Sequence, residues 1–131
     1  MVLRFKLKAN YSSWPTWYAD GVRVGDFDPA QLPISQETLQ RLLKWQEVYD
    51  STYQDDYPYN SSFPSQEARE IWGRERLRLW AQLHNELSSE YEVVSDIMHE
   101  GKIQVLTLEE LPDEIKARCQ NDIENASQPL L

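Results

Sequence analysis

The chain has 131 residues, and its 22 Asp and Glu against 13 Lys and Arg give a formal net charge of -9. A surface this acidic repels nucleic acid and anionic membranes and attracts basic proteins. Hydrophobic residues make up 40% and charged residues 27%, which is ordinary globular usage. We therefore expect one domain over residues 1–131, with a core of its own and a basic protein as its partner.

Few residues of the chain could build a metal or covalent site. Cys119 is the only cysteine, so an internal disulfide cannot form. The two histidines, His84 and His99, lack the close spacing of a helical zinc motif. We expect neither a metal nor a cofactor.

The N-terminus predicts a strand and not a targeting segment. Residues 1–8 alternate polar and apolar side chains and contain no continuous apolar run. No stretch reaches the roughly 20 apolar residues that a membrane span requires. The expected location is the cytoplasm.

The first third of the chain predicts extended structure. Leu3, Phe5 and Leu7 share one side of a first strand. A hairpin should follow through residues 17–19 and 22–24, because Asp20-Gly21 is a turn signal.

Two helices come next, each opened by nearly the same phrase. Pro33-Ile34-Ser35-Gln36-Glu37 and Phe63-Pro64-Ser65-Gln66-Glu67 each place a capping Ser before a Glu in the first turn. A mostly apolar stripe at helical spacing then follows, which in the first helix consists of Leu39, Leu42, Leu43, Gln46, Tyr49 and Tyr53.

The last third predicts two more strands and a short helix. Residues 91–94 and 102–106 read as strands joined through His99-Glu100-Gly101, and a helix begins after Pro112. Residues 126–131 should form a frayed tail. The order of elements predicts a two-layer α+β domain: an antiparallel sheet with two main helices on one face and a short C-terminal helix.

No catalytic signature is present. The chain lacks a Gly-x-Ser-x-Gly sequence, and its four glycines are too scattered to cradle a phosphate. A hydrolase that works with two carboxylates stays open as the least favoured reading, since such enzymes need only two well-placed acids.

The segment between the two helices is the best candidate for a partner-binding site. It combines acids with tyrosines and contains no basic residue, and such a combination can both attract and anchor a basic protein. The candidate residues are Asp50, Tyr53, Asp55, Asp56, Tyr57 and Tyr59, with Trp14 as a neighbouring aromatic. The alternative is structural, because Tyr49 and Tyr53 fall at helical spacing and can both belong to the core.

Several short motifs give the chain a family likeness. They are Trp14-Pro15-x-Trp17, Asp28-Pro29-x-x-Leu32-Pro33-x-Ser35, Trp45-x-x-x-Tyr49-Asp50, Phe63-Pro64-Ser65 and Tyr91-Glu92-Val93-Val94. With them the chain resembles a group of small, uncharacterised bacterial proteins over residues 14–94. In size, acidity and lack of catalytic groups it also resembles bacterial immunity proteins that neutralise toxins delivered between cells.

These observations favour a non-enzymatic cytoplasmic inhibitor. It would bind a basic toxin domain, such as a nuclease, whose active site must attract phosphate and is therefore positively charged. Direct binding of nucleic acid or membrane is not expected. The competing hypothesis is an adaptor or regulatory domain whose acidity serves only solubility.

Overall fold

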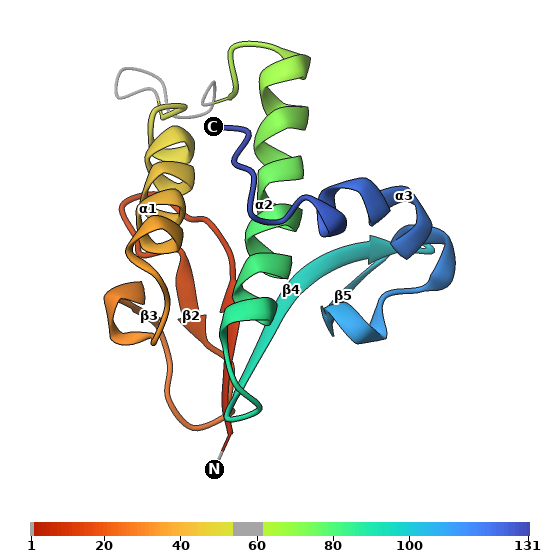
Figure 1. The fold of residues 1–131 in the computed structure, drawn as a ribbon. Helices are drawn as coiled ribbons and strands as arrows, with labels where there is room; N and C mark the ends of the chain where they lie inside the picture. Colours follow the sequence, from red (N-terminus) through yellow and green to blue (C-terminus); the bar gives the residue numbers. More distant parts are fainter. Residues whose placement is uncertain (1, 54–61) are drawn as a thin grey trace.

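The computed structural model describes residues 2–53 and 62–131 (Figure 1). The helices are α1 (Gln36–Asp50), α2 (Gln66–Glu86) and α3 (Asp113–Glu124), with short 3-10 turns η1 (Pro29–Gln31) and η3 (Leu108–Glu110). The strands are β1 (Leu3–Leu7), β2 (Thr16–Tyr18), β3 (Asp26–Phe27), β4 (Tyr91–His99) and β5 (Lys102–Thr107). The predicted α+β class is confirmed.

The five strands form one sheet in the order β3-β2-β1-β4-β5. Three of the neighbouring pairs are antiparallel, but β1 and β4 run parallel, with Phe5 opposite Val93. The wholly antiparallel sheet predicted from the sequence is therefore wrong at this pair. The reason is the long connection through α1 and α2, which returns the chain to the starting end of the sheet before β4 begins.

Both predicted helix starts are confirmed. The Ser35 hydroxyl accepts the amide of Thr38 at 3.1 Å, and the Ser65 hydroxyl accepts the amide of Ala68 at 3.0 Å. Glu37 and Glu67 occupy the first turns, where a negative charge favours the helix dipole. Local capping chemistry therefore fixes where each helix begins.

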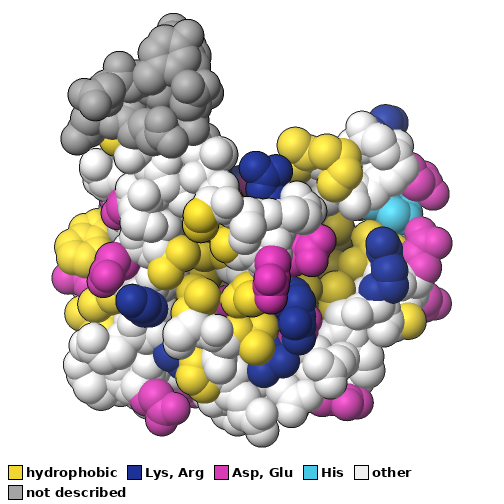
Figure 2. All heavy atoms as spheres, turned by 90° about the horizontal axis from the view of Figure 1, so that it is seen from above, with side chains coloured by type: hydrophobic (Ala, Val, Ile, Leu, Met, Phe, Trp, Pro, Cys, Tyr) yellow, Lys and Arg dark blue, Asp and Glu magenta, His cyan; other side chains and the backbone are white. Residues whose placement is uncertain are grey.

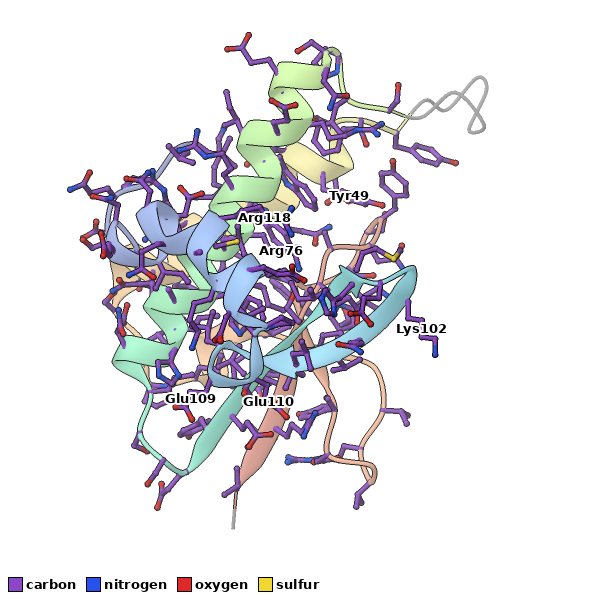
Figure 3. All side chains as sticks on the ribbon, turned by 90° about the vertical axis from the view of Figure 1, so that its right-hand side faces the viewer. Tyr49, Arg76, Lys102, Glu109, Glu110 and Arg118 are labelled. Atoms are coloured by element: carbon purple, nitrogen blue, oxygen red, sulfur yellow. The ribbon has the colours of Figure 1, made fainter. Side chains whose placement is uncertain are left out.

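The core lies between the sheet and the helices. Alternation along β1 and β4 turns Phe5, Leu7 and Val93 toward the helices, where Trp45 and Trp80 are fully buried. Further core residues are Leu42, Leu79, Leu83, Ile97, Leu108, Leu111 and Ile115. The helices all lie on this side, and the other face of the sheet carries none of them (Figure 3).

The predicted strand at residues 22–24 is absent. Val22 and Val24 lie in the β2–β3 loop with 84% and 90% of their surface exposed. The Asp20 carboxylate accepts the amides of both Val22 and Arg23, which closes a local turn. Because that turn engages these amides, β3 begins only at Asp26.

The C-terminal residues pack against α1 and α2. The sequence predicts a frayed end from residue 126, and in the structure Ala126 is buried with its carbonyl accepting Arg41 Nη1 at 2.7 Å. Arg78 Nη1 donates to the carbonyl of Gln128 at 2.9 Å, and the Leu130 amide lies 3.3 Å from Glu75 Oε1. Buried arginines need acceptors, and the backbone of this segment provides them.

Candidate partner-binding face

Aromatic side chains gather where α1 ends and α2 begins. Tyr49 packs on Tyr11 with ring centroids 4.5 Å apart and on Trp72 at 5.3 Å. Tyr53 meets Tyr11 edge-on at 5.2 Å, and Phe63 lies 5.3 Å from Trp72. We call these five residues the aromatic end of the molecule; they bring together the β1–β2 loop, the end of α1 and the start of α2.

The aromatic end is joined to the core through Trp72, which is partly buried and stacks on the fully buried Trp45. The Trp45 and Trp72 rings stack with centroids 4.5 Å apart and planes within 5°. Each indole N–H donates to the main-chain carbonyl of the other residue, at 3.1 and 2.9 Å. This reciprocal contact ties α1 to α2 and gives the aromatic end a rigid base.

Tyr49 belongs mainly to the packed structure. Burial raises the pKa of its phenol, with the neighbouring Tyr11 adding to the effect, so the ring stays neutral at physiological pH. Its neighbour Tyr53 is 45% exposed. The two tyrosines at helical spacing thus differ: one supports the surface and the other belongs to it.

Asp50 organises the loop beside it. Its Oδ1 accepts the amide of Ser12 at 2.9 Å and the side-chain amide of Gln46 at 3.1 Å. Gln46 in turn donates to the carbonyl of Asn10 at 2.7 Å. Asp50 therefore holds the β1–β2 loop against α1, a role that its place in the sequence did not reveal.

Trp14 lies on the same loop and is 42% exposed. Its amide donates to Asp26 Oδ2 at 2.7 Å, which fixes the loop to β3. The structure thus places three of the predicted site residues, Trp14, Asp50 and Tyr53, on the β1–β2 loop and the adjoining end of α1. The other four, Asp55, Asp56, Tyr57 and Tyr59, lie outside the described residues.

Figure 2 views the molecule from this end, where hydrophobic side chains open to solvent lie among charged ones. Seven of the thirteen Lys and Arg pair with carboxylates elsewhere: Arg4, Lys6, Arg23, Arg41, Lys44, Arg74 and Arg78. The side chain of Arg76 reaches from α2 to β4, where it donates to Ser95 Oγ at 2.7 Å and to the Asp96 carbonyl at 2.8 Å. Because most of the cations already pair within the chain, few of them remain to offset the surplus of carboxylates.

Sequence reasoning missed Tyr11, which is partly buried, and three exposed residues of the β4–β5 hairpin. Tyr11 joins the aromatic end through the β1–β2 loop, and no spacing rule connects it to residues about forty positions later. Met98, Ile103 and Val105 are exposed on the β4–β5 hairpin at 63%, 66% and 40%. Alternation in residues 102–106 could have shown that Ile103 and Val105 share a face, but not that this face is uncovered.

The described residues offer little for other chemistries. They contain no group of three or more His, Cys, Asp and Glu side chains that could hold a metal ion. Among the helices that the structure describes, none is both long and apolar enough to cross a membrane.

Comparison with known proteins identifies the family. The model of a family described as Serratia CdiI immunity protein-like matches residues 3–96, from β1 to the middle of β4. The chain belongs to this family. A comparison with curated proteins gives no match. Immunity proteins neutralise toxins, so membership agrees with the toxin-neutralising function that the sequence suggested. The motifs of the predicted family likeness, which span residues 14–94, lie inside the matched region.

Proposed function

We propose that this chain is a non-enzymatic immunity protein that binds and neutralises a basic toxin domain in the cytoplasm. The observation that carries the proposal is membership of the CdiI immunity protein-like family. The acidic surface supports it, because a net charge of -9 suits a positively charged partner. A nuclease is the toxin class that fits best, since an active site that attracts phosphate is basic. A nuclease toxin would act in the cytoplasm, where its nucleic-acid substrate is.

The aromatic end and the segment that follows α1 form the proposed binding face. Tyr53 and Trp14 add exposed aromatic surface, and aromatic residues dominate the energetics of protein interfaces. Asp55, Asp56, Tyr57 and Tyr59 complete the face as proposed from the sequence. Asp50 contributes indirectly, because it positions the loop that carries Trp14.

The test uses a basic nuclease toxin domain, taken from the gene next to the one for this chain where that gene encodes such a domain. Wild-type protein should bind that domain in a stoichiometric complex and abolish its activity. Asp55→Ala, Asp56→Ala, Tyr57→Ala and Tyr53→Ala should each weaken binding, by about 2 kcal/mol or more at a hot spot, while changing stability by no more than roughly 0.5 kcal/mol.

Two controls separate binding from folding. Glu90→Ala removes an exposed acid from the connection between α2 and β4, at the opposite end of α2 from the proposed face, and should leave affinity unchanged. Figure 3 shows the proposed face by Tyr49 at one end of α2. Tyr49→Ala should destabilise the fold by a few kcal/mol, because it empties a packed position. If the wild type binds no toxin, the adaptor reading replaces the proposal. If the toxin binds but only changes on another face weaken it, the proposed face is wrong.

A further inference from the structure

The two edges of the sheet are not equally protected. At one edge β3 has only two residues, Asp26 and Phe27, and presents almost no backbone to a new strand. At the other edge β5 has six residues, and the first four are exposed. Proteins usually guard a long edge with charges, proline or a bulge. Between Lys102 and Glu109 the sequence has neither a charged residue nor a proline.

The hairpin turn determines which groups of β5 are free. Glu100 and Gly101 both have positive φ, 53° and 75°, as a two-residue type I′ turn requires. In such a hairpin the flanking residues His99 and Lys102 exchange hydrogen bonds, and bonded positions then alternate along the strand. Gln104 and Leu106 therefore point their backbone groups at β4, whereas those of Ile103 and Val105 point away.

An independent contact agrees with this alternation. The amide of Thr107, next in the outward series, donates to the Glu110 side chain at 2.9 Å instead of to β4. Beyond the ladder with β4, no backbone-to-backbone hydrogen bond involves residues 103–105 within the part of the chain that the structure describes. Ile103 and Val105 thus present one N–H and one C=O each to a new strand.

The side chains beside this edge are apolar and exposed. Ile103 lies opposite Met98 in the ladder, and Val105 follows on the same face of the sheet. Figure 3 shows Lys102 at the tip of this hairpin, pointing away from the helices. A strand added to β5 would cover apolar side chains as well as pair its backbone.

Charge decides between the possible occupants. Residues 100–114 contain five carboxylates, Glu100, Glu109, Glu110, Asp113 and Glu114, against the single cation Lys102. This surrounding favours a basic segment. A second copy of the chain would bring the same acidic set, and a further charge of -9, against the first.

We propose that β5 is a docking edge, where an extended segment of the basic toxin domain adds a sixth strand by pairing with Ile103 and Val105. The segment would place apolar residues on Met98, Ile103 and Val105 and basic residues near the flanking carboxylates. The inference rests on the proposed function and adds a second contact, largely outside the region matched by the family model.

Hydrogen exchange resolved to single amides tests the docking edge. In the free chain the amides of Ile103 and Val105 should exchange fast, while those of Gln104 and Leu106, already in the ladder, exchange slowly. Adding the toxin domain should slow the exchange of the Ile103 and Val105 amides by about tenfold or more. Their exchange rates should then differ little from that of Gln104. The neighbouring residues are internal controls within one measurement.

A substitution pair provides the second test. Val105→Pro removes an outward N–H without removing a ladder bond, so the fold should persist while affinity falls at least about tenfold. Val105→Thr keeps the N–H and should lose less affinity. Val24→Thr, at an exposed valine of the β2–β3 loop, should lose none. Melting curves check that each variant is folded. If the proline variant unfolds, the hydrogen-exchange measurement on the wild-type chain still tests the docking edge.

The outcomes separate this inference from the proposed function. If the wild type binds no toxin domain, the proposed function and the docking edge are both overturned. If the toxin binds while Ile103 and Val105 keep exchanging fast, or Val105→Pro binds normally, only the docking edge is overturned. Protection of these amides in the free chain at high concentration, together with a dimer in sedimentation, would assign the edge to a second copy and also overturn it.

Discussion

Gly73 sits in the interior of α2, where a glycine weakens a helix. A glycine in a helix can permit close packing against a neighbouring element. A Cβ built at Gly73 meets nothing within 4 Å, so no neighbour accounts for the glycine.

Gly73→Ala should therefore stabilise the protein. The expected gain is about 1 kcal/mol, because alanine loses less conformational entropy and its methyl group has room. Urea denaturation of the two proteins measures it. Gly101→Ala is the contrasting change, since Gly101 has a φ of 75° and alanine there should destabilise. A loss of stability in the Gly73 variant would show a constraint on α2 that packing does not reveal.

At the scale of elements, buried charges connect α1, α2, α3 and the C-terminal segment. Arg41 and Glu75 pair at 3.2 Å with exposed side-chain fractions of 7% and 1%, and Arg78 lies 2.8 Å from Asp122. The same arginines donate to the carbonyls of Ala126 and Gln128. Removing one partner from such a network leaves a buried charge unsatisfied.

Deleting residues 126–131 should cost about 3 kcal/mol of folding free energy. The deletion takes acceptors away from two buried guanidinium groups, and hydrogen bonds to charged groups are the expensive ones to lose. Denaturant unfolding of full-length and truncated protein gives the value. Removing Leu131 alone, which is 37% exposed, should change little. Equal stability of the full-length protein and the protein lacking residues 126–131 would mean that these residues add nothing to the stability of the fold.

The same network predicts a dependence on pH through Asp122. Burial alone would raise the pKa of this carboxyl, but hydrogen bonds and charges from Arg74 and Arg78 lower it overall. A lowered folded-state pKa gives stability that is present above the ordinary value near 3.8 and lost as pH falls through the folded value.

Asp122→Asn should thus destabilise the protein most at neutral pH. Its difference in unfolding free energy from wild type should shrink as pH falls below about 4. Urea unfolding across the acid range tests this. Glu124→Gln, which removes an exposed carboxylate of the same helix, is the matched control. A difference between Asp122→Asn and wild type that stays constant down to the lowest pH would contradict the role of the Arg74 and Arg78 contacts.

At the scale of the whole molecule, the net charge of -9 should govern how fast a partner is found. We expect the association rate with a basic toxin domain to fall steeply with added salt, because screening shortens to about 8 Å at physiological ionic strength. Stopped-flow mixing at several salt concentrations measures this. Dissociation should change less, since it depends on the short-range contacts. Salt-independent association would indicate an interface driven by apolar contacts alone.

Local signals in the sequence determined much of the architecture. Ser35 and Ser65 mark the starts of both long helices, because capping depends on a few neighbouring residues. The Glu100-Gly101 turn and its flanking strands were likewise predictable from adjacent residues. The excess of carboxylates follows from composition alone, and it is why a basic partner could be predicted before any fold was known.

Tertiary structure decided the features that depend on residues far apart in the chain. The parallel pairing of β1 with β4 depends on how α1 and α2 cross the sheet, which no local pattern records. In β2, Thr16 is fully buried and Trp17 is only half-buried opposite Lys6. A strand of three residues is too short for alternation to predict which face points inward. Asp50 became a loop anchor only when the Ser12 amide came within reach. Likewise β5 is an edge strand because no other described element pairs beyond it, and a free sheet edge has no local sequence pattern that predicts it.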